Sequence, residues 1–158
     1  IAEHLAPQLE AFICEISSVC SPVVNTGEDG GKARRALLSL LQRAGRLSVL
    51  RVFNALEADE LLAVADATSH NQSLRKVDCS WSSNVTNESV ARVATAAPHL
   101  QEFKYVMVDY NRSGVSELTA VGAKALREMC PAAVVDIRLM VPNAGRPRSP
   151  IEEYILRL

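Results

Sequence analysis

The heptapeptide LQEFKYV, residues 100–106, contains the pattern that decides the fold of this chain. Its apolar residues Leu100, Phe103 and Tyr105 follow the spacing Leu-x-x-apolar-x-apolar. The same spacing returns in LEAFICE at 9–15, LSVLRVF at 47–53, LRKVDCS at 74–80 and VVDIRLM at 134–140. Apolar residues at every second position predict a short strand with one buried face. Copies that start at positions 9, 47, 74, 100 and 134 therefore predict a repeat protein.

Helical patterns separate these strand patterns. Segments 32–43, 57–68, 89–97 and 116–129 carry apolar residues three and four positions apart, which is typical of amphipathic helices. In the last segment, this spacing predicts an inward face made of Leu118, Val121, Ala125 and Met129. Pro98 and Pro131 end two of the helices before the next strand. Strands and helices therefore alternate along the chain, which predicts the α/β class.

Two α/β architectures fit such an alternation. A doubly wound sheet usually has longer strands with unrelated flanking sequences, and no glycine-rich phosphate motif follows any strand of this chain. Here one phrase returns at each strand, and the preceding helix ends at the same offset. We therefore expect a short, irregular solenoid of repeats, with parallel strands on its concave face and helices on its convex face.

One segment, ELTAVGAKALREMCPAAVVDIRL at 117–139, resembles a repeat of a known family. The residues that carry the resemblance are Leu118, Thr119, Gly122, Ala125, Leu126, Cys130 and Pro131. They are similar to the cysteine-containing leucine-rich repeat of F-box adaptors, a solenoid like that of ribonuclease inhibitor. The resemblance implies a role in protein–protein interaction. It also implies a ubiquitin-ligase substrate receptor if an F-box lies outside this fragment.

The domain organisation follows from composition. The leucine-rich-repeat domain is expected to span 1–141, with a flexible glycine-rich insertion at 26–32. Residues 142–150, PNAGRPRSP, contain three prolines and predict a linker.

The last residues, 151–158, are predicted to form an amphipathic helix. Ser149 can cap it, Pro150 suits its first position, and Glu152 completes a capping box. Its apolar stripe has the spacing i, i+3, i+4, i+7 and consists of Ile151, Tyr154, Ile155 and Leu158. A helix of two turns is not stable alone. It must either cap the open end of the solenoid or dock in a groove of a partner.

The sequence gives no support for catalysis, a metal or a cofactor. Four cysteines form no CxxC pair, three histidines are available, and His70 and His99 lie outside any catalytic motif. GEDGGKA at 27–33 lacks the first glycine and the hydroxyl residue of a phosphate-binding loop. The chain is therefore predicted to be a non-catalytic adaptor or structural subunit of a larger assembly, with protein partners and no small-molecule substrate.

The partner-binding residues are predicted from the phase of the strands. Residues between the inward positions point to the concave face, where one column is expected to run Ile13, Arg51, Asp78, Lys104 and Arg138. A second column is expected to include Phe53, Val106 and Met140, and a third Lys76, Glu102 and Asp136. Exposed apolar residues beside charged ones are typical of protein-binding surfaces. The expected site is Arg51, Phe53, Lys76, Asp78, Lys104, Val106, Arg138 and Met140.

A basic segment offers an alternative function. The helix that begins at Lys32 is the most basic part of the chain, whose net charge is −1. These cations can form the solvated face of an amphipathic helix, or they can contact RNA or an acidic partner. The residues concerned are Lys32, Arg34, Arg35, Arg43 and Arg46. The alternative function is thus that of a ribonucleoprotein subunit.

Two further features concern the compartment. Asn71, Asn84, Asn87 and Asn111 each begin an Asn-x-Ser/Thr sequon, which serves either glycosylation or the capping of helices. No apolar run approaches the ~20 residues that span a bilayer, and no membrane role is expected. We expect an intracellular protein, in the cytoplasm in the first place and in an organelle as the alternative.

Overall fold

The computed structural model describes residues 6–15, 28–53, 58–80, 82, 85–108, 118–141 and 152–155. A short 3-10 helix, η1, spans Ala6–Gln8. The strands are β1 Ala11–Glu15, β2 Val49–Phe53, β3 Lys76–Asp78, β4 Glu102–Val108, β5 Val134–Val141 and β6 Glu152–Ile155. The α-helices are α2 Glu28–Leu41, α3 Ala58–Thr68, α4 Asn87–Ala96 and α5 Ala120–Met129.

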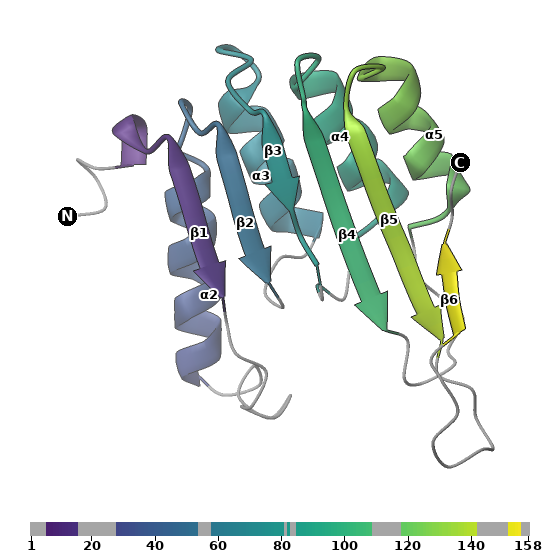
Figure 1. Cartoon of the computed structure of the whole chain (residues 1–158). Helices are drawn as coiled ribbons and strands as arrows, with labels where there is room; N and C mark the ends of the chain where they lie inside the picture. Colours follow the sequence, from purple (N-terminus) through teal and green to yellow (C-terminus); the bar gives the residue numbers. More distant parts are fainter. Residues whose placement is uncertain are drawn as a thin grey trace.

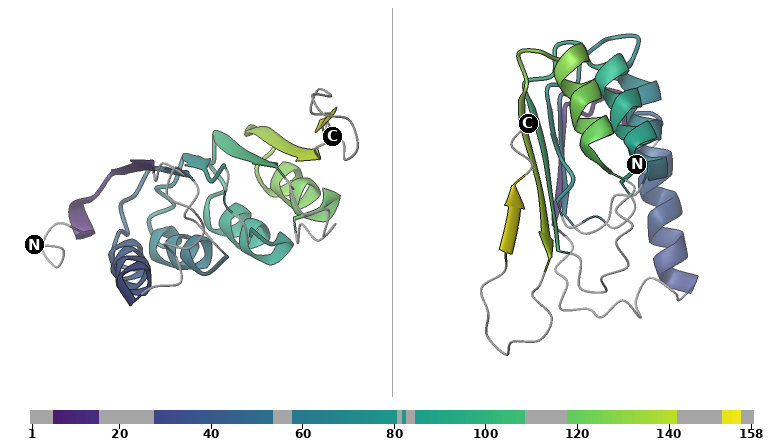
Figure 2. Two further views of the ribbon diagram at one scale, coloured as in Figure 1. Left: turned by 90° about the horizontal axis from the view of Figure 1, so that it is seen from below. Right: turned by 90° about the vertical axis from the view of Figure 1, so that its right-hand side faces the viewer.

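The strands form one open sheet whose spatial order follows the chain, β1-β2-β3-β4-β5-β6 (Figure 1). The first five strands are parallel, and β6 pairs antiparallel with β5. The helices that connect the parallel strands lie side by side on one face of the sheet (Figure 2). No described element covers the other face. The predicted α/β class and the parallel sheet are therefore confirmed.

The core lies between the sheet and the helices, and the repeated phrase supplies its sheet side. Among the middle three copies, every phrase residue is at most 1% exposed: Leu47, Leu50, Val52, Leu74, Val77, Cys79, Leu100, Phe103 and Tyr105. Full burial of one leucine contributes ~1.5–3 kcal/mol, so this period-two pattern alone selects the register of the strands. The hydroxyl of Tyr105 donates to the backbone carbonyl of Ser82 at 3.2 Å, so its polar end is also satisfied.

The helices are joined to their neighbours by polar contacts as well as by apolar packing. Arg92 of α4 makes an ion pair with Asp66 of α3 at 2.7 Å. Thr86 and Ser89 form a capping box at the start of α4. Asn87, in the first turn of α4, accepts hydrogen bonds from the backbone N–H groups of Thr119 and Gly122, both at 2.9 Å. The beginning of α4 therefore holds the beginning of α5.

The inward face predicted for the last helix is wrong at Val121 and Met129, whereas Leu118 is buried as predicted. Val121 is 67% exposed and Met129 is 46% exposed, whereas Ala123 and Leu126 are buried. The physical reason is the helix start: Thr119 is the N-cap of α5, so Leu118 lies before the helix and the helical phase cannot be counted from it.

The predicted insertion at 26–32 is also wrong in its described part, because α2 begins at Glu28. Two glycines in the first turn cost about 1 kcal/mol each relative to alanine. Residues 26 and 27 lie outside the described residues.

The phase of β5 differs from the prediction. Val134 was expected to be equivalent to Leu100, but it pairs with Glu102 and is 67% exposed on the uncovered sheet face. The inward residues of β5 are Val135 and Ile137.

The turn before β5 gives the reason for this shift. The N–H of Ala133 donates to the carbonyl of Cys130 at 2.9 Å, as the N–H of Leu100 donates to the carbonyl of Ala97. Ala133 therefore takes the place of Leu100, and the interval between the first two inward residues is one residue shorter in β5. An alanine in place of the leading leucine hides this shortening in the sequence.

The helix predicted at 151–158 is wrong as well, because Glu152–Ile155 form strand β6 against the C-terminal half of β5. The same stretch has apolar residues at every second position, namely Tyr154, Leu156 and Leu158, which is a strand pattern. The free edge of β5 supplies backbone hydrogen-bond partners that a two-turn helix cannot find alone. Ile151, Leu158 and the predicted linker 142–150 lie outside the described residues.

Candidate functional site

The uncovered face of the parallel sheet carries the predicted partner-binding residues. The strand register arranges them in rows that cross the sheet. The first row contains Ala11, Val49, Lys76, Glu102 and Val134, and the second contains Ile13, Arg51, Asp78, Lys104 and Asp136. A third row has Phe53 on β2 and pairs Val106 with Arg138.

The three predicted neighbour pairs between β4 and β5 are wrong because of the shifted phase of β5: Glu102, for example, pairs with Val134 and not with Asp136. Lys104 stands beside Asp136 and not beside Arg138, which pairs instead with Val106. Met140 pairs with Val108 rather than with Val106. The face therefore brings together seven of the predicted residues: Arg51, Phe53, Lys76, Asp78, Lys104, Val106 and Arg138. The backbone of Met140 lies near the C-terminal end of β5.

Glu102 is the centre of the charged side chains on this face. Its carboxylate lies 3.7 Å from Nζ of Lys76 and 3.9 Å from a guanidinium nitrogen of Arg51. All three side chains are about 40% exposed. Solvent-exposed pairs of this kind contribute about 0–1 kcal/mol each, so they leave these side chains available for a partner.

Asp78 differs from the other carboxylates because it is only 7% exposed. Its Oδ1 accepts hydrogen bonds from the hydroxyl of Ser80 at 2.6 Å and from the N–H of Ser80 at 3.2 Å. Asp78 therefore closes the turn after β3, which is a structural role. The place of Asp78 in the second row supports the prediction that it contacts a partner, and its burial argues against that prediction.

The sequence reasoning did not select two exposed apolar residues of this face. Ile13 on β1 is 66% exposed and Val134 on β5 is 67% exposed. Ile13 stands between two inward positions of its phrase, so strand phase was a sufficient signal for it. Val134 carried no such signal, because the shortened phrase made it look like a core residue.

One cation of the basic segment is engaged in ion pairs between two helices. Nε of Arg34 lies 2.8 Å from Oε1 of Glu60, which is fully buried on α3, and a second nitrogen lies 3.6 Å from Asp59. Arg34 thus joins α2 to α3, and its role as an RNA contact stays a prediction. Lys32 and Arg35 are exposed on α2, while Arg43 and Arg46 are exposed in the turns after it.

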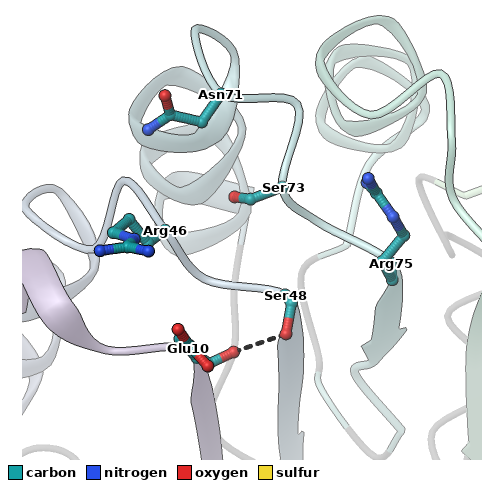
Figure 3. A pocket seen from close by; sticks show the side chains of 6 residues that line it. All are labelled: Glu10, Arg46, Ser48, Asn71, Ser73 and Arg75. Carbon is teal, nitrogen blue, oxygen red and sulfur yellow. Dashed lines mark hydrogen bonds between the residues drawn. The ribbon is translucent and has the colours of Figure 1, made fainter.

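Arg46 instead lines a shallow polar hollow at the edge of the sheet where the parallel strands begin (Figure 3). The six lining residues are Glu10, Arg46, Ser48, Asn71, Ser73 and Arg75. Backbone carbonyls take up many of their donors: Ser48 donates to Glu10 at 2.8 Å, Ser73 to Leu47 at 2.9 Å and Asn71 to Gly45 at 3.0 Å. Arg75 donates to the carbonyls of Gln72 and Leu74. These hydrogen bonds stabilise the loops that lead into β2 and β3.

The buried cysteines do not form nucleophilic sites. Cys79 and Cys130 are free thiols in the core. Burial, and secondarily the charge of Asp78, raises the pKa of the Cys79 thiol far above its usual range. Burial also raises the pKa of Cys130, whose Sγ lies 3.3 Å from the carbonyl oxygen of Ala97. Both sulfurs therefore stay protonated near neutral pH, and a thiol is a poor nucleophile compared with a thiolate.

The described residues contain neither a metal-binding cluster nor a membrane-spanning helix. In the described ranges, no three His, Cys, Asp or Glu side chains gather in a way that could hold a metal ion. Nor does the described part of the chain contain a helix of the length and apolarity needed to cross a membrane. No protein-family model, no curated protein and no solved structure matches this chain.

Proposed function

We propose that the chain is a short leucine-rich-repeat solenoid that acts as a non-catalytic protein-binding module, either as an adaptor or as a structural subunit of a larger assembly. The observation that carries the proposal is the uncovered sheet face, where exposed apolar and charged side chains lie in register on five neighbouring strands. A surface of this composition is typical of protein interfaces.

Repeated backbone geometry supports the solenoid part of the proposal. The residues that end α4 and α5, Ala97 and Cys130, have the same backbone angles, φ −126° and ψ 65°. The carbonyls of Glu10, Ser48 and Arg75 each accept two successive N–H groups at the start of the following strand, in the same pattern. The starts of β2, β3 and β4 therefore share one geometry, as stacked repeats do.

The RNA-binding alternative has less support. Arg34 is held by Glu60, and Arg46 lies at the edge of the sheet, away from α2. A charge-based RNA complex weakens steeply with salt, so the salt dependence of binding distinguishes the two functions. The free, buried thiols of Cys79 and Cys130 suit a reducing compartment, which supports the proposal of an intracellular location.

The experiment compares what the protein captures before and after changes on the sheet face. We expect Ile13→Asp and Val134→Asp to remove a set of captured proteins. Val121→Asp is the matched control, because Val121 is as exposed as Val134 but lies on α5, on the helical side. Urea unfolding of each variant shows that the fold is kept. If the Val121 variant loses the same proteins and the two sheet-face variants keep them, the sheet face is not the binding surface.

A further inference from the structure

The uncovered sheet face is divided into an apolar half and a charged half. On β1 and β2, the described side chains of the face are Ala11, Ile13, Val49, Phe53 and Arg51. Arg51 is the one charged member of this set, and its guanidinium reaches across β3 to Glu102 on β4. Its charge is therefore directed toward Glu102, which leaves the other described side chains around Ile13 apolar. The side chain of Glu15, at the end of β1, lies outside the described residues.

The charged half, on β3 and β4, has an excess of positive charge. Arg51, Lys76 and Lys104 surround a single exposed carboxylate, that of Glu102. The other carboxylate in this area, Asp78, is buried and is bound by Ser80. The centre of the face therefore offers more cationic than anionic groups to a partner.

Lys104 is the cation whose charge is least compensated. Its neighbours in the second row are Asp78 and Asp136. Asp78 is bound by Ser80, and Asp136 lies 2.7 Å from Nε of Arg138. In the described part of the chain, neither carboxylate is within ion-pair distance of Lys104. A carboxylate from outside the chain can therefore pair with Lys104 without breaking an existing ion pair.

We infer that the partner is a protein segment that presents an acidic side chain to Lys104 and an apolar side chain to Ile13. The two residues belong to the same row and are three strands apart, which corresponds to about 14 Å at ~4.8 Å per strand. An extended segment rises ~3.3 Å per residue, so the acidic and apolar residues stand about four positions apart in the partner. This inference rests on the proposed function.

A nucleic-acid partner fits the face less well, although a phosphate group could also pair with Lys104. The carboxylate of Glu102 lies within the charged half, and that of Asp136 lies beside it on β5. Single-stranded nucleic acid is held by aromatic stacking as well as by charge, and Phe53 is the only aromatic side chain among the described residues of the face. The apolar half instead suits an aliphatic or aromatic side chain of a protein.

The test is selection of a displayed library of random dodecapeptides on the whole chain. We expect enriched peptides to share an acidic and an apolar residue about four positions apart. A synthetic peptide of that consensus should bind Lys104→Glu at least tenfold more weakly than it binds the parent protein. Arg127→Glu is the control, because Arg127 is exposed on α5 and should leave the affinity unchanged. A peptide with lysine in place of its acidic residue should recover binding to Lys104→Glu.

Other outcomes overturn the inference. Enriched peptides without acidic residues overturn it, as does a consensus peptide that binds Lys104→Glu normally. A library that yields no enriched peptide overturns it too, and so does a single-stranded RNA oligonucleotide that binds the parent protein but not Lys104→Glu. Peptides that lose binding to Ile13→Asp but not to Lys104→Glu contradict the inference and leave the proposed function standing. Peptides that bind every sheet-face variant normally contradict both.

Discussion

The Oδ1 atom of Asn87 lies 2.9 Å from the backbone nitrogen of Gly122, so a side chain from the first turn of α4 binds the first turn of α5. The same oxygen accepts the N–H of Thr119 at 2.9 Å, and Nδ2 of Asn87 donates to the hydroxyl of Thr119 at 3.0 Å. One amide group therefore satisfies donors that a helix N-terminus leaves without intrahelical partners.

Gly122→Ala should destabilise the protein, although alanine is the better helix former. A Cβ atom at position 122 would lie 2.6 Å from Cδ1 of Leu118 and 2.8 Å from Oδ1 of Asn87. We expect a loss of ~1–3 kcal/mol in the free energy of unfolding, because the added methyl group overpacks the contact. Urea unfolding measures it. Lys124→Ala, an exposed change in the same helix, should alter stability by less than about 0.5 kcal/mol. A gain in stability for Gly122→Ala would show that the close approach is absent.

Asn87→Ala should also destabilise the protein, by ~1–2 kcal/mol, because the N–H of Thr119 loses its side-chain acceptor and the N–H of Gly122 keeps only the carbonyl of Thr119, at 3.1 Å. Asn87→Asp keeps the acceptor oxygens and loses only the donor, so it should cost less. Glu88→Ala serves as the control, since Glu88 is the exposed neighbour in the same turn. Equal costs for the alanine and aspartate variants would contradict the role assigned to Oδ1.

The same contacts bear on the sequons. Asn87 caps α5 and Ser89 completes the capping box of α4, which supports the capping interpretation for the sequon at 87–89. Asn71 and Ser73 donate to the carbonyls of Gly45 and Leu47, so the sequon at 71–73 stabilises the contact between the loops before β2 and β3. Asn84 and Asn111 lie outside the described residues, and their sequons keep both interpretations.

Arg34→Met should destabilise the protein by ~1–3 kcal/mol, because it removes a charged hydrogen-bond partner from the fully buried Glu60. The expected loss in the free energy of unfolding is smaller than for a fully buried ion pair, because the Arg34 side chain is 43% exposed and water can partly replace it. Urea unfolding of Arg34→Met, Glu60→Met and the double variant forms a double-mutant cycle. We expect the double variant to be more stable than the single variant Arg34→Met, in which the buried Glu60 has lost Arg34 as its partner.

Arg35→Met is the matched control for this cycle, because Arg35 is the exposed neighbour of Arg34 on α2. Its effect on stability should stay within about 0.5 kcal/mol. Additive costs of the Arg34 and Glu60 substitutions would mean that the two side chains do not interact.

The sequence predicted the middle of the sheet well because bulky residues occupy every inward position there. Leu50, Val77 and Phe103 lie in register, as their shared place in the phrase requires. The phase of β5 could not be predicted in the same way. An alanine replaces the leading leucine and one residue is missing, so Val134 matched the pattern better than Ala133 did.

The candidate site was predictable in its membership and less so in its interactions. Strand phase was sufficient to select Arg51, Lys76 and Lys104. Arg51 reaches over β3 to form an ion pair with Glu102. This contact depends on the length of the two side chains and on the free space above the sheet, and a spacing pattern encodes neither. The tail shows a different limit. Tyr154 fits both a helical stripe and a strand alternation, and the free edge of β5 decides between them.

The last prediction concerns the buried thiols and pH. Burial raises the pKa values of Cys79 and Cys130 in the native state, whereas thiols of the unfolded chain ionise near a pKa of about 8.5. Below that pH both states hold protonated thiols, and the two cysteines have no effect on the pH dependence. Above it the unfolded chain loses protons that the native chain keeps, so the free energy of unfolding should fall as pH rises.

Urea unfolding from pH 7 to pH 10 measures this fall in a variant in which Cys14 and Cys20 are replaced by serine. Replacing Cys79 by alanine in the same background should make the fall shallower, because Cys79 has the larger upward pKa shift and is the more deeply buried of the two. A thiol reagent at pH 8 gives a second measure. The native protein should react slowly and the urea-unfolded chain rapidly at both cysteines, because only the unfolded chain exposes a thiolate. Rapid reaction of Cys79 in the native state would contradict its burial against Asp78 and the sheet.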